Sequence, residues 1–495
     1  FQNLTTSNTL NYTNIFEGYH SVRALLGQEA NRYNYEYIFT YAPGVDPQIP
    51  YVNTANQANT ETEQGFTRET LLSFFGILDY NYDNKYFAQL TAREDGSSLF
   101  GEQNKWGFFW SASASWNMTR EKWMQYRWLD LLKIRASYGV NGNNGIAAYK
   151  AYGVYASSTY NGVVGMLPSQ PSNPYLSWEK NGTWNVGVDF GFFNRLRGSV
   201  DVYSRKTTDM LLDKRVPQTT GFSTNFMNAG AMKNDGVEFQ IDGDIVATSD
   251  MLWSAGLNLA YNRTEILDLA GDEKIAAASY MHYVVGKSRY TYYLTDYYGV
   301  NPSNGEALFR TEKGTLTNDA SKAQKIYAGS PEPKLIGGFN TSFAWKGFSA
   351  SAFFEFKAGN KVFLVNEWSY LNSDGSQMNM NQMASSNNYW KKPGDTGVQP
   401  KPVAGQSVSN DATLSTRWLA DGSYLRVKDI TVSYSLQERA LKKLKVKGLK
   451  FYVSGLNLYC FNDVNFWDPE QGITGLTAGT YPLTKSVVGG IELSF

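Results

Sequence analysis

The sequence has 495 residues, and aromatic side chains make up 15% of them, with tyrosine the most frequent. Acidic and basic residues balance at 45 each, so the net charge of zero gives no signal for nucleic acid as a partner. No run of about 18 apolar residues occurs, which excludes an ordinary transmembrane helix and leaves a β-barrel open.

Residues that commonly carry chemistry are scarce. Cys460 is the only cysteine, which excludes an internal disulfide framework and a cysteine metal site. The two histidines, His20 and His282, stand in unrelated contexts and form neither a triad nor a metal cluster by spacing. We therefore predict no cofactor, no metal and no enzymatic activity. The first residues, FQNLTTSNTL, lack the basic and apolar regions of a secretory signal, so we expect such a signal to be absent or already removed.

Apolar and polar residues alternate along most of the chain, which predicts a series of β-strands. In chain order these lie near 14–29, at 71–80 and 86–95, at 106–118 and 131–140, at 183–193 and 195–204, at 237–246 and 251–261, at 335–345 and 348–356, at 423–436 and 449–460, and at 489–495. They make about fourteen strands. Most approach the ~10 residues that cross a bilayer as a tilted strand.

The connections between these strands alternate strictly between short and long. Short turns are predicted near residues 83, 194, 248 and 346, with slightly longer ones at 120–130 and 437–446. Long polar loops are predicted at about 30–70, 96–106, 142–178, 207–235, 266–333, 360–422 and 461–485. A soluble sandwich has no reason to sort its loops in this way, whereas outer-membrane barrels have short periplasmic turns and long extracellular loops. We therefore predict an all-β fold, a multi-pass antiparallel β-barrel in the bacterial outer membrane.

Charged residues on the polar faces of these strands fit a wet or plugged lumen. The predicted lumen-facing residues are Arg93, Lys133, Arg135, Asp189, Asp201 and Glu238. In the closing stretch GGIELSF, alternation predicts that Leu493 and Phe495 face lipid or the insertion machinery and that Glu492 faces the lumen.

Several ordered stretches resemble the SusC/RagA family of TonB-dependent outer-membrane transporters of Bacteroidetes. They cover nearly the whole chain from about residue 70 onward and include AREDGSSLFGEQNKWGFFWSASASWNMTREKW (92–123), LLKIRASYGVNGNNGI (131–146), NPYLSWEKNGTWNVGVDFGFFNRLRGSVDVYSRKTTDMLL (173–212), TTGFSTNFMNAGAMKNDGVEF (219–239), GSPEPKLIGGF (329–339), DGSYLRVKDITVSYSL (421–436), and DPEQG with the closing YPLTKSVVGGIELSF.

The resemblance implies a 22-stranded barrel closed by an N-terminal plug, with a TonB box that couples it to the proton gradient. It implies uptake of oligosaccharides or oligopeptides delivered by a SusD-like surface lipoprotein, in a dimer of transporter and lipoprotein pairs. Residues 1–495 would be the C-terminal portion of such a barrel, with the plug and first strands outside this sequence.

The long loops are dense in aromatic residues, which can stack on sugar faces or peptide side chains or can simply pack the loops together. The predicted ligand-binding rings are Tyr290, Tyr292, Tyr293, Tyr297, Tyr298, Trp368, Tyr370 and Trp390. Two other functions stay open. A passive porin or adhesive barrel would conduct without an energy source, and a barrel enzyme would have to use His282, which has no recognisable partner motif. Nothing in the sequence separates glycan from peptide as cargo.

Overall fold

The computed structural model describes residues 1–46, 48–49, 51, 59–365, 382–403, 414–436, 446–464, 467–477 and 481–494. Contacts divide the chain into two compact units, described separately below. The first unit comprises Phe1–Met124, Lys133–Val186 and Arg205–Ala231, and the second comprises Gln125–Leu132, Gly187–Ser204 and Met232–Phe495.

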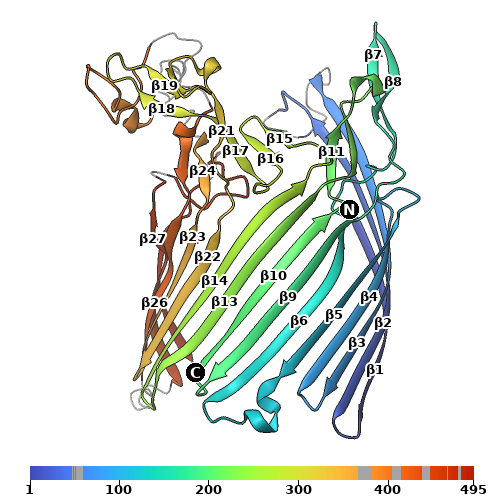
Figure 1. The fold of residues 1–495 in the computed structure, drawn as a ribbon, viewed down its shortest axis with the longest axis vertical. Helices are drawn as coiled ribbons and strands as arrows, with labels where there is room; N and C mark the ends of the chain where they lie inside the picture. Colours follow the sequence, from blue (N-terminus) through green and yellow to red (C-terminus); the bar gives the residue numbers. More distant parts are fainter. Residues whose placement is uncertain are drawn as a thin grey trace. The chain divides into compact units, whose positions relative to one another are not determined.

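A main sheet of fifteen strands runs through the described residues in the order β1-β2-β3-β4-β5-β6-β9-β10-β13-β14-β22-β23-β26-β27-β28 (Figure 1). The strands are β1 (Gln2–Phe16), β2 (His20–Tyr41), β3 (Glu61–Tyr82), β4 (Tyr86–Ser97), β5 (Trp106–Asn117), β6 (Leu129–Asn143), β9 (Glu179–Phe192), β10 (Leu196–Thr208), β13 (Ala231–Ala247), β14 (Met251–Asp268), β22 (Leu335–Trp345), β23 (Phe348–Ala358), β26 (Tyr424–Ser435), β27 (Gly448–Asn462) and β28 (Ser486–Ser494).

Smaller elements fill the connections. The first unit carries the hairpins β7 (Val154–Tyr160) with β8 (Val163–Gln170) and β11 (Leu211–Arg215) with β12 (Thr224–Asn228), and the 3-10 turns η3 (Met118–Arg120), η4 (Lys122–Met124) and η5 (Gln218–Thr220). The second carries β15 (Lys274–Ala278), β16 (Met281–Val284), β17 (Thr291–Thr295), β18 (Tyr297–Val300), β19 (Ala307–Arg310), β20 (Leu316–Thr317), β21 (Lys325–Tyr327), β24 (Lys361–Phe363), β25 (Leu419–Asp421), η6 (Ala320–Lys322), η7 (Ala384–Asn387) and η9 (Thr416–Trp418).

Tight turns join neighbouring strands at one end of the main sheet, as the sequence predicts. Asp83 and Asn84 have φ of 51° and 52°, and Lys346 and Gly347 have φ of 46° and 91°. Two consecutive residues with positive φ match the right-handed twist of paired strands, and Asn, Asp and Gly adopt that conformation most easily. The predicted turns near 83, 194, 248 and 346 are therefore confirmed.

Two predictions about the start of the chain are wrong. The stretch 14–29 is not one strand, because the turn 17–19 ends β1 and begins β2, which raises the count of main strands from about fourteen to fifteen. The predicted loop 30–70 consists mostly of strand, since β2 continues to Tyr41 and β3 begins at Glu61. Polar and aromatic residues on both faces hid these extensions from a search for an apolar face. The predicted turn at 437–446 lies almost wholly outside the described residues.

The sheet of the first unit has one polar and one apolar face. Cross-strand neighbours follow the register from β2 to β6, so each face forms rows of aligned side chains. One polar row runs Arg23, Asp79, Gln89, Ser113 and Ser137, and the next row on the other face runs Ala24, Leu78, Leu90, Ala112 and Tyr138. The apolar row includes exposed side chains, with Leu78 at 45% and Leu90 at 55%. Such an unburied apolar face suits lipid rather than water.

Buried residues gather in the connections rather than within the sheet. Three clusters occur in the described residues. One, in the first unit, comprises Phe100, Phe109, Ala151, Leu176 and Trp178, and two, in the second unit, comprise Met281, Tyr292, Leu294, Phe363 and Trp418, and Val362, Leu364 and Val464. The long connections thus contribute most of the residues of these buried clusters.

Candidate functional site

The polar face of the first unit holds the three basic residues predicted to face the lumen. Arg93 in β4 donates from Nε to both carboxylate oxygens of Asp95, at 2.7 and 2.9 Å, and from Nη2 to the Ser73 hydroxyl at 2.7 Å. Its guanidinium also lies 5.2 Å from the centre of the Phe75 ring. Arg93 is therefore fixed by neighbours in β3 and β4.

Lys133 and Arg135 line a depression of about 390 Å³ on this polar face. The Lys133 ammonium lies 4.9 Å from the centre of the Phe87 ring. Across the same depression Gln89 donates to Asp79 at 2.6 Å. The sequence prediction that β4 and β6 carry their charges on one face is supported by this arrangement, whereas what that face contacts in the intact protein stays a prediction.

In the second unit, Asp201 of β10 and Glu238 of β13 line a smaller depression of about 200 Å³ together with Gln240 and Asn258. Asp189, the last predicted lumen-facing residue, lies half-buried in β9. These three acidic residues thus lie in the neighbouring strands β9, β10 and β13 of the second unit.

A folded lobe formed by residues 269–334 connects β14 to β22 and contains most of the predicted ligand-binding rings. Tyr292 in β17 is fully buried, and its hydroxyl donates to the carbonyl oxygens of Thr474 and Gly475, 3.0 and 3.1 Å away. Burial raises the pKa of this hydroxyl far above its ordinary value. Tyr292 therefore holds the lobe to the chain that follows β27, and its ring offers no surface to a ligand.

The other predicted rings have mixed surroundings. Tyr293 stacks on His282 with ring centres 4.3 Å apart, and Tyr297 is half-buried against Phe309. Tyr298 is 52% exposed. A binding role for these rings stays a prediction.

Two further rings differ just as much in their surroundings. Tyr290 is half-buried under the Arg289 guanidinium, while Trp390 is 7% exposed and donates its indole N–H to the carbonyl of Pro302 at 3.0 Å. Trp368 and Tyr370 lie outside the described residues. Of the predicted set, Tyr298 has the most open ring among the described residues.

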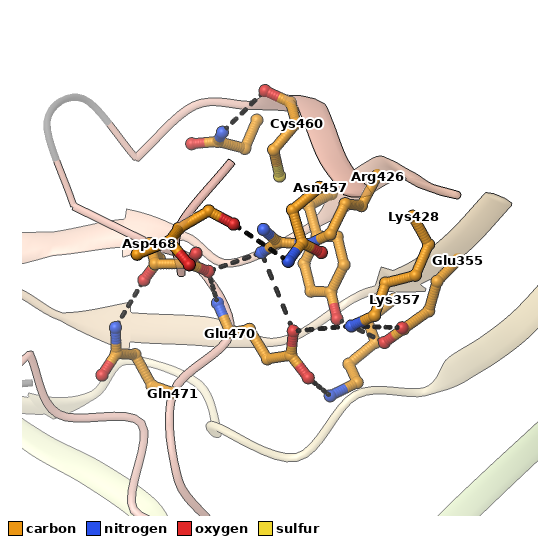
Figure 2. Close-up of polar contacts among 12 residues, drawn as sticks. Glu355, Lys357, Arg426, Lys428, Asn457, Cys460, Asp468, Glu470 and Gln471 are labelled. Carbon is orange, nitrogen blue, oxygen red and sulfur yellow. Dashed lines mark hydrogen bonds and ion pairs between the residues drawn. The ribbon is translucent and has the colours of Figure 1, made fainter. Parts of the chain in front are cut away.

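The segment that follows β27 is tied to the sheet by a network of charges (Figure 2). Arg426 of β26 pairs with Asp468 at 2.6 Å and with Glu470 at 3.7 Å, and the Arg426 side chain is only 4% exposed. Lys357 and Lys428 approach Glu470 at 3.9 and 3.7 Å.

Glu355 of β23 completes the network, pairing with Lys428 at 3.1 Å and accepting a hydrogen bond from the Tyr424 hydroxyl at 2.9 Å. Together with Tyr292 in the lobe, this network fixes the segment 468–477 at both ends. Sequence reasoning did not find it, because its members lie far apart along the chain.

A pocket of about 570 Å³ lies in the second unit between the end of β14, the lobe and the start of β24. Its charged lining consists of Arg263, Glu265, Lys287, Glu332, Lys334 and Lys361, four basic and two acidic. Lys361 is paired with Asp421 at 3.0 Å, and Ser288 donates to Glu332. The volume of this pocket lies within the range of ~300–1,000 Å³ that is usual for ligand pockets.

The arrangement around His282 does not resemble a catalytic site. The imidazole is packed against Tyr293 and Tyr327, and burial, followed by the charges of Lys274 and Lys325, lowers its pKa. Among the described residues, its Nδ1 atom has no hydrogen-bond partner. The residues that the structure describes also contain no group of three His, Cys, Asp or Glu residues that could hold a metal ion.

The predicted loop 30–70 contains YNYEYIFTY, residues 33–41, whose alternating rings the structure places in β2. Their period of two was the signal for a strand with one aromatic face.

None of the helices in the part of the chain that the structure describes has the length and apolar character needed to cross a membrane. Residues 1–458 match a family model described as TonB dependent receptor-like, beta-barrel. The chain therefore belongs to this family of outer-membrane β-barrel proteins.

Its relatives narrow the family to the SusC/RagA group. The chain is 29% identical over 535 residues to TonB-dependent receptor P26 of Formosa agariphila, covering 99% of this chain and 53% of that protein. It is 30% identical over 459 residues to TonB-dependent receptor SusC of Bacteroides thetaiotaomicron, covering 87% of this chain and 44% of that protein.

Solved structures of the RagAB peptide transporter match the whole chain at 28% identity. One has a TM-score of 0.87 and is covered over 55% of its own chain; another, in an "open-open" state, has a TM-score of 0.89 and is covered over 54%. The chain thus spans about half the length of the curated relatives and of these structures.

Proposed function

We propose that the chain forms wall and surface loops of an active importer that takes up oligopeptides or oligosaccharides through the outer membrane. The observation that carries the proposal is the match to the RagAB peptide transporter along the whole chain, with a TM-score of 0.87 at 28% identity. The importer works with a SusD-like surface lipoprotein as a lid and draws energy from TonB, in a dimer of such pairs.

The geometry supports binding rather than chemistry. The pocket of about 570 Å³ between β14, the lobe and β24 is large enough for part of a peptide or a sugar chain, and its excess of basic groups suits carboxylates or other acceptors. The lobe has its own buried core and is anchored by Tyr292, so it is a stable surface on which a lid can close. Because Nδ1 of His282 has no hydrogen-bond partner in the described residues and the charges that act on the ring are those of Lys274 and Lys325, we propose that the protein is not an enzyme.

Uptake by cells that express the full-length protein tests the proposal. Fluorescently labelled peptides and oligosaccharides should accumulate in the periplasm, and dissipating the proton gradient should abolish the accumulation. Mild detergent should extract the protein together with a lipoprotein. Grafting a short turn in place of 269–334 should remove the lipoprotein and the uptake together while the barrel still folds.

The competing function, a passive porin or adhesive barrel, makes the opposite forecast. Accumulation that continues without a proton gradient, or conductance by the protein purified alone, would assign the chain to that class.

A further inference from the structure

A row of aromatic rings lies on one face of β2, beginning where the pairing with β1 ends: Tyr33 still pairs with Asn3 of β1, and the other rings lie beyond that pairing. The row comprises Tyr33, Tyr35, Tyr37, Phe39 and Tyr41, and we refer to it as the ring ladder. These are alternate residues of one strand, so all five project from the same face, the one that carries Glu29 and Arg23 lower down. The last four rings are 37 to 59% exposed, in the order 40, 37, 59 and 56%.

The rings follow one another at nearly the repeat of an extended chain. The centres of Tyr33 and Tyr35 are 6.5 Å apart with planes 3° from parallel, and those of Tyr35 and Tyr37 are 5.8 Å apart. Gly65 on β3 faces Tyr37, and a Cβ there would lie 2.5 Å from the ring. The ring of Tyr37 therefore lies across the neighbouring strand and widens the ladder.

Carboxylates border the ring ladder, and the described parts of β2 and β3 beside it place no Lys or Arg among them. Glu69, Glu63 and Glu61 of β3 stand opposite Tyr33, Phe39 and Tyr41 on the same face. The Tyr37 hydroxyl donates to Glu63 at 2.7 Å. The described residues of β2 and β3 from 31 to 41 and from 61 to 71 place no Lys or Arg on this face, since Arg32 and Arg68 point to the other side.

We infer that the ring ladder is a binding track for an extended peptide segment that carries lysine or arginine side chains, an inference that rests on the proposed import function. An extended peptide repeats its same-face side chains every two residues, about 6.4–6.8 Å, which matches the spacing of the rings. Cationic side chains are attracted to aromatic faces and to carboxylates, and both are present here on one face of the neighbouring strands β2 and β3.

The charge pattern sets the selectivity of the track. Three carboxylates with no Lys or Arg beside them in the described parts of β2 and β3 repel acidic ligands and favour basic ones. A neutral sugar chain would use the rings but gain little from the charges. A sensitive dependence on ligand charge therefore distinguishes the two cargo classes.

Binding to the full-length protein in detergent tests the inference with two labelled probes, the decapeptide of five Ala-Lys repeats and the same peptide with every lysine acetylated. The unmodified peptide should bind about tenfold more tightly, equal to about 1.4 kcal/mol. In the variant Glu61→Gln, Glu63→Gln, Glu69→Gln the two peptides should bind equally, whereas Tyr35→Ala with Phe39→Ala should weaken both.

The matched control is Ile38→Ala, since Ile38 lies in the same strand segment with 70% exposure but projects from the opposite face. It should bind both probes as the wild type does. Each variant is first checked for heat-dependent migration on gels, which reports a folded barrel. A third probe, a neutral glucose hexasaccharide, is measured alongside.

Equal affinity for the acetylated peptide, or unchanged affinity after loss of the two rings, would overturn the inference. The ladder would be assigned to sugars instead if the hexasaccharide binds the wild type and the glutamate variant equally well but no longer binds the ring variant. Failure of the proposed function looks different, because then cells accumulate no peptide or oligosaccharide by any energy-dependent route. If import continues unchanged in the ring variant, only the ladder inference fails.

Discussion

Replacing Arg426 with Met tests whether the network in Figure 2 holds the segment 468–477 in place. Arg426 and Asp468 have side chains only 4 and 13% exposed and lie 2.6 Å apart. Removing one partner of a buried pair typically costs ~3–5 kcal/mol, because the other charge is left without compensation. Asp468 keeps one hydrogen bond, from the Glu470 amide at 2.9 Å, so we expect the lower end, about 3 kcal/mol.

Such a loss raises the population of the opened segment by roughly 100-fold. Hydrogen exchange of the amides from 468 to 477 in the full-length protein measures this opening directly. The matched control is Asp421→Asn, which breaks the ion pair of Asp421 with Lys361, 3.0 Å long and about 40% exposed at both ends. A pair this exposed contributes less than ~1 kcal/mol, so exchange should change only a few-fold.

A double variant sharpens the result. Arg426→Met combined with Asp468→Leu removes both charges, so its cost should fall well below the sum of the two single changes. The reasoning would be refuted if hydrogen exchange in Arg426→Met were no faster than in Asp421→Asn. It would also be refuted if the free-energy cost of the double variant equalled the sum of the costs of Arg426→Met and Asp468→Leu.

Three further outcomes are expected. Tyr292→Phe removes a hydroxyl bonded to the Gly475 carbonyl and should destabilise the lobe by about 1 kcal/mol, seen as several-fold faster exchange near Gly475; unchanged exchange would contradict it. Because the pKa of His282 is lowered in the folded lobe, the unfolded form takes up the proton first, so lobe stability should fall as the pH drops below about 6.5. Protease digestion at pH 5.5 and 7.5 measures this, and His282→Phe should remove the difference. Protease added to intact cells should cut within 42–60 before 83–85, and the reverse order would invert the predicted topology.

Much of the main sheet could be predicted from sequence because its hairpins are encoded locally. Alternation marks the strands, and pairs such as Asp83–Asn84 and Lys346–Gly347 adopt the positive φ that tight turns require. Alternation fails where a strand has no apolar face, as in the upper parts of β2 and β3, since both their faces carry polar or aromatic residues.

The site was less accessible to sequence reasoning. Counting aromatic residues in loops cannot tell Tyr292, a buried anchor, from Tyr298, which is half-exposed, because burial depends on partners more than a hundred residues away. The pairing of Arg426 with Asp468 likewise depends on how the chain returns after β27. The predicted lipid-facing Phe495 lies outside the described residues, while Leu493 and Glu492 occupy opposite faces of β28 as alternation requires.

Segment 468–477 is attached at both ends and so connects the lobe to β26 of the main sheet. Tyr292 binds the segment near Thr474, and Arg426 binds it at Asp468. A displacement of the lobe is therefore transmitted along the segment to the carboxylates around Arg426. Cys460 stands directly across from Arg426 in the strand register, with its thiol free, and it is the only cysteine in the sequence. A fluorophore or spin label on that thiol would therefore report lobe movement as a change in its electrostatic surroundings, with no residue of this chain replaced.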